Sequence, residues 1–248
     1  MAESDSQPVR VALITGGARR VGRAVALYLA RDGWDLAITY HTSGEDMSTL
    51  ADAVERIGRQ LLPIRADFAE PEAAATKVAD AVGKRYDRLD LLLHNASLYE
   101  PADLDATDAD TVRRYFAIHA ETPLLLTKRL RPLLESAGGT VLSMTDCDLD
   151  RTRPSHLPYQ MSKAALANLT KNLARELAPR VTANNIAPGA ILWAEGMTDD
   201  DKATYLQRVP LDRAADADEV PKLVEFLCTD GKYLTGQTFR MDGGRSLR

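Results

Sequence analysis

A tyrosine and a lysine stand four residues apart, at Tyr159 and Lys163, in a stretch whose apolar pattern predicts a helix over residues 157–178. Residues with this spacing share one face of a helix. A cation beside a phenol stabilises the phenolate, which brings a side chain with an ordinary pKa of about 10 into use as an acid near neutrality. Such pairs also occur on surface helices without any chemical role, so other residues must support the assignment.

A turn rich in glycine and arginine follows the first predicted strand, with the sequence Thr-Gly-Gly-Ala-Arg-Arg-Val-Gly. The backbone N–H groups of such a turn, with the N-terminus of the next helix, can bind a pyrophosphate. The arginines would add positive charge there. The expected phosphate contacts are Gly16, Arg19, Arg20 and Val21. A tight turn with surface arginines is the alternative.

The second predicted strand ends in His41, Thr42 and Ser43 rather than in an acid. An acid at this point would bind the ribose hydroxyl of NAD and repel a 2′-phosphate, whereas hydroxyl and imidazole groups near an arginine can accept that phosphate. NADPH is therefore the expected cofactor. A polar loop without a ligand is the alternative, and Glu45 or Asp46 could still reach the ribose.

Short apolar runs alternate with longer amphipathic segments along the chain, as is typical of a parallel sheet covered by helices. The predicted strands cover residues 9–15, 36–40, 61–66, 89–94, 140–145, 181–186 and 237–241. The predicted helices cover residues 21–32, 45–58, 71–86, 108–136, 157–178 and 216–228, and Pro123 should bend the fourth. This pattern predicts an α/β fold: a single-domain Rossmann fold over residues 9–248, with a doubly wound seven-stranded parallel sheet and helices on both faces. The loops 95–107, 146–156 and 188–199 each follow a strand and should form the walls of a ligand crevice.

Composition excludes several classes of protein. The chain has 248 residues, of which 45% are hydrophobic and 27% charged, and its formal net charge is -5. It therefore has no net positive field for nucleic acid or a membrane surface. Two cysteines, Cys147 and Cys228, are too few for a disulfide framework or a thiolate metal cluster, and no metal is expected. No run approaches the roughly 20 apolar residues of a membrane span, and the polar start predicts a cytoplasmic protein with a disordered tail over residues 1–8.

The chain resembles the short-chain dehydrogenase/reductase family over almost its whole length. The resemblance rests on the glycine turn, Asn95-Ala96 after the fourth strand, the Tyr159 and Lys163 pair, and Pro188-Gly189 after the sixth strand. It implies that the tyrosine donates or relays a proton, while the lysine lowers the pKa of the tyrosine and holds the nicotinamide ribose. The further cofactor contacts expected are Asp67, Phe68, Asn95, Ala96, Ser97, Tyr159, Lys163, Pro188 and Gly189.

Asp146 stands thirteen residues before Tyr159, where most members of that family have a serine. An ionised carboxylate cannot donate a hydrogen bond to a carbonyl oxygen, so it serves a ketone poorly. It suits a nitrogen heterocycle, in which a ring nitrogen takes up a proton while hydride reaches the adjacent carbon. The Asp and Tyr combination, with Arg20 at the usual second glycine of the turn, resembles the pteridine reductases. Two alternatives are that Asp146 caps a helix or turn, or that a shift of one position makes Thr145 the hydroxyl partner.

The resemblance to pteridine reductases implies a set of substrate contacts. These are Arg20, Ser97, Tyr99, Asp146, Tyr159 and Trp193. Tyr99 would stack on the pterin and sandwich it against the nicotinamide, and the planar fork of Arg20 would meet both the cofactor phosphates and a pterin oxygen. Trp193 and Met197 are candidates for an apolar lid. The ending Asp-Gly-Gly-Arg-Ser-Leu-Arg is similar to that of these reductases, in which the C-terminus packs at a subunit interface, so a homotetramer is implied.

His119 lies four residues before Pro123, where the family usually has an asparagine that anchors a helix bend and a water chain to the lysine. An imidazole could hold that water or be an ordinary core histidine. This position and the arginine-rich ending most resemble dihydromonapterin reductases.

The predicted activity is NADPH-dependent reduction of a C=N bond in a small-molecule pterin, namely dihydromonapterin, dihydrobiopterin or dihydrofolate. Tyr159 and Asp146 would supply the proton. One alternative is an NADPH-dependent ketone or 3-oxoacyl reductase, in which Thr145 provides the hydroxyl. Another is a non-catalytic dinucleotide sensor, whose usual sign is loss of the tyrosine or the lysine; both are present here.

Overall fold

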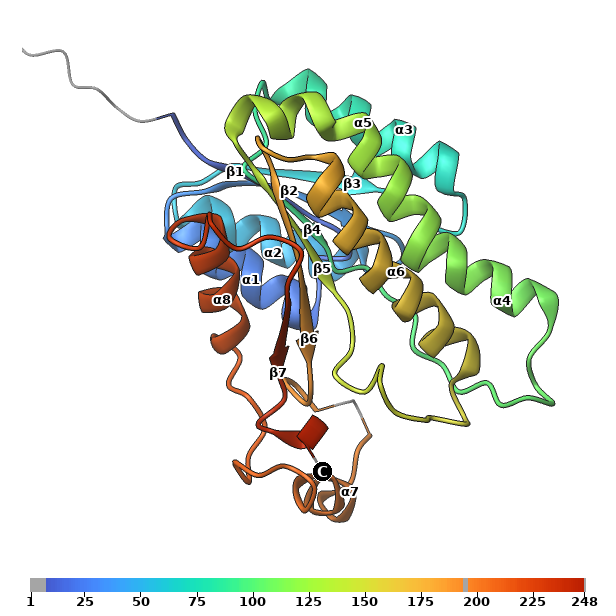
Figure 1. Cartoon of the computed structure of the whole chain (residues 1–248). Helices are drawn as coiled ribbons and strands as arrows, with labels where there is room; N and C mark the ends of the chain where they lie inside the picture. The colour runs from blue at the N-terminus through green and yellow to red at the C-terminus, as the bar shows by residue number, and fades with distance from the viewer. Residues whose placement is uncertain (1–7, 194–195, 248) are drawn as a thin grey trace, which may run out of the picture.

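The computed structural model of the chain describes residues 8–193 and 196–247 (Figure 1). Seven parallel strands form one sheet in the order β3-β2-β1-β4-β5-β6-β7. The strands are β1 (Val11–Ile14), β2 (Asp35–Tyr40), β3 (Leu61–Arg65), β4 (Leu91–His94), β5 (Thr140–Met144), β6 (Thr182–Pro188) and β7 (Thr238–Met241). The predicted doubly wound, seven-stranded Rossmann fold is confirmed. Apart from residue 8, the tail expected over residues 1–8 lies outside the described residues.

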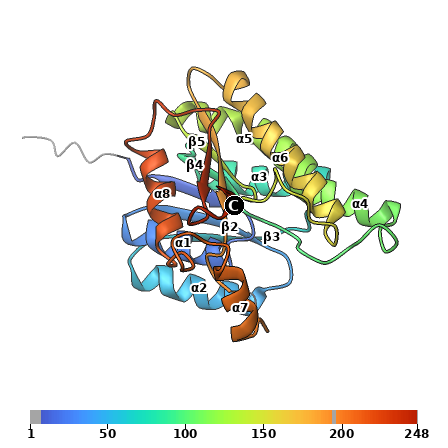
Figure 2. The same cartoon turned by 60° about the horizontal axis from the view of Figure 1, so that its bottom comes forward.

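Helices cover both faces of the sheet (Figures 1 and 2). They are α1 (Arg20–Arg31), α2 (Gly44–Arg56), α3 (Pro71–Arg85), α4 (Ala109–Phe116), α5 (Thr122–Ala137), α6 (Leu157–Glu176), α7 (Asp199–Leu206) and α8 (Glu219–Cys228). Helices α1, α2 and α8 pack on one face, and α3, α5 and α6 on the other. Along β1, Ala12 and Ile14 face the first group while Val11 and Leu13 face the second, because successive side chains of a strand alternate between faces. A strand buried on both sides therefore reads as a continuous apolar run.

The long helix predicted over residues 108–136 is divided in two. Helix α4 ends at Phe116, a π-helical turn covers Ala117–Glu121, and α5 begins at Thr122. In that turn the backbone N–H of Thr122 donates to the carbonyl of Ala117, five residues back. Pro123 has no N–H for the ordinary bond to residue 119, so a change in the hydrogen-bond pattern at this point is expected. The helix is therefore altered next to Pro123, as predicted, but the alteration is a π-helical turn rather than a simple bend.

Helix α7 was not predicted, because residues 188–199 were assigned to a loop and the segment after it to no element. A capping box marks its start: the Thr198 hydroxyl accepts from the backbone N–H of Asp201, and the Asp201 carboxylate accepts from the backbone N–H of Thr198. The Thr-Asp-Asp-Asp sequence is a recognisable start signal for a helix. No residue of α7 is buried, so the helix lacks the apolar stripe on which the prediction relied.

The strand order reverses between β1 and β4, and this reversal places the ligand crevice. The chain runs from β1 to β3 towards one edge, and β4 then returns to the other side of β1. Crevices for ligands lie beyond the carboxyl ends of strands at such a reversal. The loops after β4, β5 and β6 all lie at the lower edge in Figure 1, which Figure 2 turns forward.

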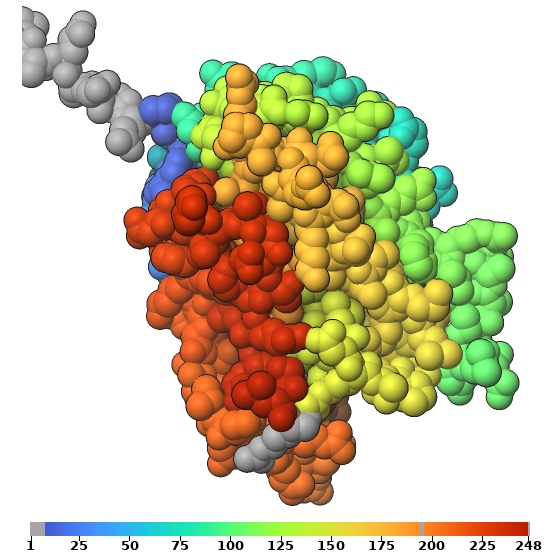
Figure 3. Space-filling view, viewed as in Figure 1, coloured from blue at the N-terminus to red at the C-terminus, as the bar shows by residue number. Residues whose placement is uncertain are grey.

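The C-terminal segment closes on the same edge of the sheet. In Figure 3 it lies, in red, against the yellow residues that follow β5. A hydrogen bond between Arg245 and Asp148 joins the two segments. None of the helices in the described ranges is long and apolar enough to cross a bilayer.

Candidate active site

The glycine turn and the end of β4 form one hydrogen-bonded floor. The Thr15 hydroxyl accepts from the backbone N–H groups of Asn95 and Ala96, at 2.9 and 3.0 Å. The Asn95 side chain donates to the carbonyl of Thr15 at 2.9 Å and to that of Gly16 at 3.1 Å. Gly16 has a φ of +61°, and a Cβ at Gly22 would lie 2.6 Å from the Asn95 amide nitrogen. The turn therefore needs glycine where it meets Asn95.

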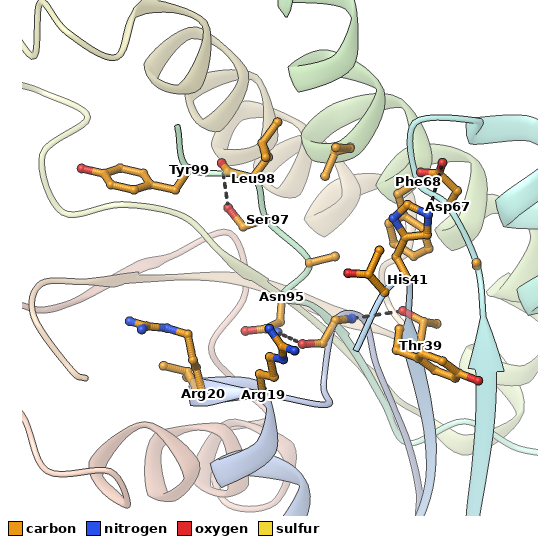
Figure 4. A pocket seen from close by; sticks show the side chains of 18 of the residues that line it. Arg19, Arg20, Thr39, His41, Asp67, Phe68, Asn95, Ser97, Leu98 and Tyr99 are labelled. Carbon is orange, nitrogen blue, oxygen red and sulfur yellow. Dashed lines mark hydrogen bonds and ion pairs between the residues drawn. The ribbon is translucent and has the colours of Figure 1, made fainter. Parts of the chain in front are cut away.

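A cavity of about 680 Å³ extends from this floor along the ends of β2 and β3 (Figure 4). Of the residues predicted to bind ligands, it brings together Gly16, Arg19, Arg20, Val21, His41, Thr42, Asp67, Phe68, Asn95, Ala96, Ser97 and Tyr99. Lining residues that the sequence reasoning did not select are Gly22, Thr39, Tyr40, Ala66, Leu98, Arg114 and Ile118. The predicted residues that lie outside its lining are Ser43, Asp146, Tyr159, Lys163, Pro188, Gly189 and Trp193.

Charged groups gather at the end of the cavity formed by β2 and β3. The imidazole of His41 lies 3.5 Å from the carboxylate of Asp67, and Arg19 forms an ion pair with Asp46. Arg65 donates from its guanidinium to the carbonyl of His41 at 3.3 Å. Arg65 was missed by the sequence reasoning, although it ends β3 beside the last residue of β2. Arg19, Arg65 and the imidazole of His41 therefore lie at one end of the cavity, and each has an acid or carbonyl partner.

Arg20 connects the glycine turn to the segment after β6. Its backbone has a φ of +50°, and its guanidinium donates to the carbonyls of Leu192 and Trp193, at 2.8 and 3.3 Å. The indole of Trp193 packs edge-on against the ring of Tyr205, with ring centres 5.5 Å apart. Of the two predicted substrate residues, Arg20 therefore lines the cavity, while Trp193 lies outside its lining and accepts a hydrogen bond from Arg20.

Asp146 and Tyr159, the two residues predicted to supply the proton, are in direct contact. The phenol of Tyr159 donates to one carboxylate oxygen of Asp146 at 2.9 Å. The other carboxylate oxygen accepts from the backbone N–H of Asp148 at 2.7 Å, so Asp146 also caps a turn, which was one of its two alternatives. The Thr145 hydroxyl is buried and donates to the carbonyl of Ile186 at 3.1 Å. The alternative in which Thr145 partners the tyrosine is therefore wrong.

Burial is the main cause of the pKa shifts of Lys163 and Tyr159. Lys163 is buried and donates to the carbonyl of Met144 at 2.8 Å, and burial lowers its pKa to about 8 against the opposing charge of Asp146. Burial, followed by the negative charge of Asp146, raises the pKa of Tyr159 above its ordinary value. This is opposite to the lowering expected from Lys163, because the ammonium points at Met144 while the carboxylate contacts the phenol. Tyr159 therefore keeps its proton at neutral pH, as a proton donor must.

His119 joins the loop after β4 to helix α6. It is fully buried, and its Nε2 accepts from the backbone N–H of Leu98 at 3.1 Å. Its Nδ1 therefore carries the proton and donates to the Ser162 hydroxyl at 2.8 Å. Ser162 in turn donates to the carbonyl of Tyr159. Burial, then the positive charge of Lys163, holds the pKa of His119 well below its usual range, so this histidine is a neutral connector.

Tyr99 lies between the loops that follow β4 and β5. Its ring stacks on His156 with centres 4.6 Å apart and meets the ring of Tyr159 edge-on at 4.9 Å. A β-bridge between Ala102 and His156 holds the two loops together. Figure 4 shows the Tyr99 side chain extending away from Arg19 and His41. Its contacts in the second loop were missed because they depend on the approach of two loops, which sequence spacing does not report.

Similarity to known proteins agrees with this geometry. Residues 16–246 match the family model described as enoyl-(acyl carrier protein) reductase. A dihydromonapterin reductase from Klebsiella pneumoniae is 33% identical over the full length of both chains. One from Shigella boydii is 35% identical over 98% of this chain and 99% of its own length.

Solved structures show the same likeness. The alternative dihydrofolate reductase FolM of Brucella canis, complexed with NADP, has a TM-score of 0.89 and 32% identity, over 96% of this chain and 94% of its own. Acetoin dehydrogenase of Enterobacter cloacae has a TM-score of 0.88 and 29% identity, over 98% and 97%. The chain thus belongs to the short-chain dehydrogenase/reductase family, as do the dihydromonapterin reductases among its relatives.

Proposed function

We propose that this protein is an NADPH-dependent pteridine reductase, which reduces a C=N bond of a dihydropterin. Dihydromonapterin is the first candidate substrate, because relatives of that name match the whole chain. Dihydrobiopterin and dihydrofolate are the next candidates. The observation that carries the proposal is the hydrogen bond from Tyr159 to Asp146, together with the Thr145 hydroxyl turned to Ile186.

The residues present fit a dinucleotide. Gly16 and Gly22 line the cavity and pack closely on Ala96 and Asn95, which sets the turn in place beneath the N-terminus of α1, where backbone N–H groups can bind a pyrophosphate. Arg19, His41 and Thr42 line the far end of the same cavity, where the 2′-phosphate of NADPH would lie. A solved relative from Brucella canis that carries NADP supports this choice of cofactor. Reduced nicotinamide supplies the hydride when it is bound.

The proton comes from the chain. Tyr159 holds its proton on the phenol oxygen, because burial and Asp146 both raise its pKa. The carbon of the C=N bond takes up hydride and the nitrogen takes up this proton, so the double bond becomes CH–NH. Asp146 accepts the phenol hydrogen bond before transfer and, as an acceptor, is matched to a substrate whose ring carries N–H donors. Lys163 lies with its ammonium 5.9 Å from the centre of the Tyr159 ring and would hold the nicotinamide ribose beside the phenol.

A panel of substrates tests the proposal. NADPH oxidation is followed with dihydromonapterin, dihydrobiopterin, dihydrofolate and a 3-oxoacyl thioester, each with wild type and Tyr159→Phe. We expect turnover of at least one pterin, weak or no turnover of the thioester, and loss of turnover in the variant. Turnover of the thioester without any pterin would replace the proposal with a carbonyl reductase of the same fold.

The predicted homotetramer remains a prediction. The state of the protein in solution can be measured by analytical ultracentrifugation on the same preparation.

A further inference from the structure

Arg153, in the loop after β5, contacts the aromatic ring that lines the substrate side of the cavity. One guanidinium nitrogen donates to the hydroxyl of Tyr99 at 3.0 Å. The other donates to the carboxylate of Asp148 at 2.9 Å. The arginine side chain is 25% exposed and that of Asp148 only 6%, so the bond to Asp148 is partly buried while the bond to Tyr99 lies at the surface. Arginine suits this position because its planar guanidinium can donate hydrogen bonds to two partners in fixed directions.

Asp148 is itself held from a second side. Arg245, next to the C-terminus, donates to the same Asp148 oxygen at 3.2 Å and stacks on the ring of Tyr205. Figure 3 shows the C-terminal segment seated against this part of the chain. Asp148 is therefore a fixed anchor for Arg153, and the position of Arg153 is set by the packed chain rather than by its own loop alone.

The hydroxyl of Tyr99 has Arg153 as its hydrogen-bond partner within the described residues. Tyr99 is 54% exposed, and its ring contacts His156 on one face and Tyr159 at an edge. The bond to Arg153 holds the hydroxyl end of the ring. Arg153 also lies 3.8 Å from the Asp146 oxygen that accepts from Tyr159, yet Asp146 keeps its two hydrogen bonds without it.

We infer that Arg153 is a positioning residue that fixes the ring of Tyr99 for flat heterocyclic substrates. This inference rests on the proposed function, since Tyr99 is the ring expected against the pterin. Arg153 acts on substrate binding through Tyr99. Its guanidinium also lies 3.8 Å from Asp146, and its charge lowers the pKa of Tyr159 against the larger effect of burial, so Arg153→Gln should change kcat to a small extent as well. Tyr99→Phe removes the bond and keeps that charge, so it should change the KM for a pterin and leave kcat nearly unchanged.

The test compares five variants by steady-state kinetics with NADPH and dihydrobiopterin. Arg153→Gln should raise the KM for the pterin by about tenfold, the effect of losing one hydrogen bond to a charged group, with kcat within about threefold of wild type. Arg153→Lys keeps the charge without the fork and should give an intermediate KM. Tyr99→Phe removes the same bond while leaving Asp148 untouched, so it stays informative if Arg153→Gln folds poorly.

Arg151→Gln is the matched control, because it removes one positive charge from the same loop at a side chain without a hydrogen bond in the described structure. Its KM should equal that of wild type. In the double variant of Arg153→Gln with Tyr99→Phe, the two effects on KM should overlap rather than multiply.

Three results separate the possible failures. If wild type reduces no pterin, the proposed function is wrong and this inference falls with it. If wild type reduces dihydrobiopterin but Arg153→Gln matches Arg151→Gln, Arg153 has no positioning role. If the double variant shows the full product of the two KM effects, Arg153 does not act through Tyr99. Binding of NADPH, measured by fluorescence, should be the same in wild type and in the single variants at Arg153 and Arg151, which do not line the cavity.

Discussion

Replacing Asp146 by asparagine should separate the chemistry from the binding of NADPH. In the structure, one carboxylate oxygen accepts from Tyr159 and the other from the N–H of Asp148. An amide offers a single acceptor oxygen, so one of these two donors would lose its partner. An unsatisfied buried donor costs about 1–3 kcal/mol, so we expect the free energy of unfolding of Asp146→Asn to fall by that amount.

The same substitution should reduce pterin turnover by about two to four orders of magnitude, the usual contribution of an acid–base partner. It should also shift the pH profile. Activity should need Lys163 in its charged form, so wild-type kcat/KM should fall as the pH rises through about 8, the pKa of Lys163. The negative charge of Asp146 raises that pKa, and its removal should move the alkaline fall in activity to lower pH.

The assay is kcat/KM for dihydropterin from pH 6 to about 10, with the Kd of NADPH from fluorescence and the free energy of unfolding from urea titration. Asp146 does not line the cavity assigned to the cofactor, so the Kd should be unchanged. Asp150→Asn is the control, because Asp150 is exposed on the same loop and pairs with Arg240. Wild-type turnover with an unshifted profile in Asp146→Asn would refute the role given to this carboxylate.

The remaining predictions concern the cofactor turn, acid stability and the choice of cofactor. Gly22→Ala should weaken NADPH binding and lower the free energy of unfolding, because the new Cβ would lie 2.6 Å from Asn95. In the control Gly83→Ala, in α3, the new Cβ meets no atom within 4 Å, so the substitution should be neutral or stabilising. Urea unfolding and NADPH titration of both variants check this, and equal behaviour would contradict the close packing of the turn. Burial lowers the pKa of His94 to about 3, so only the unfolded state takes up this proton below about pH 6.5, and stability should fall with decreasing pH. In His94→Leu the slope of the unfolding free energy against pH, below about pH 6.5, should be smaller than in wild type by about 1.4 kcal/mol per pH unit. Urea unfolding from pH 4 to about 7 measures this slope. An unchanged slope would show that His94 is protonated in the folded protein. NADPH should be preferred over NADH in kcat/KM, and Arg19→Gln should reduce that preference by about tenfold; equal use of both cofactors by wild type would contradict the phosphate site.

Local patterns predicted most of the fold because each one is a short-range consequence of the backbone. Strand β1 is buried on both faces and reads as Val-Ala-Leu-Ile, and the turn after it places Gly16 at a φ of +61°, which is a local requirement for glycine. Tyr159 and Lys163 share α6, and their spacing alone puts them on one face. The sequence also marked Asp146 as the residue that departs from a carbonyl reductase.

Other features depend on groups that only the folded chain brings together. His119 and Ser162 are 43 positions apart, and Tyr99 and Arg153 are 54 apart, so no local pattern could pair them. The predicted direction of the Tyr159 pKa shift was wrong for the same reason. The pKa is raised by burial and by the position of the Asp146 carboxylate, whereas the spacing along the helix shows only that Lys163 is near. The sequence by itself predicted the strands, the helices other than α7, and the residues of the glycine turn and of α6 whose types can do chemistry. Tertiary packing decided which groups are buried, where each side chain points and which loops are in contact. The reason is that solvation and electrostatic interactions depend on neighbours that are distant along the chain.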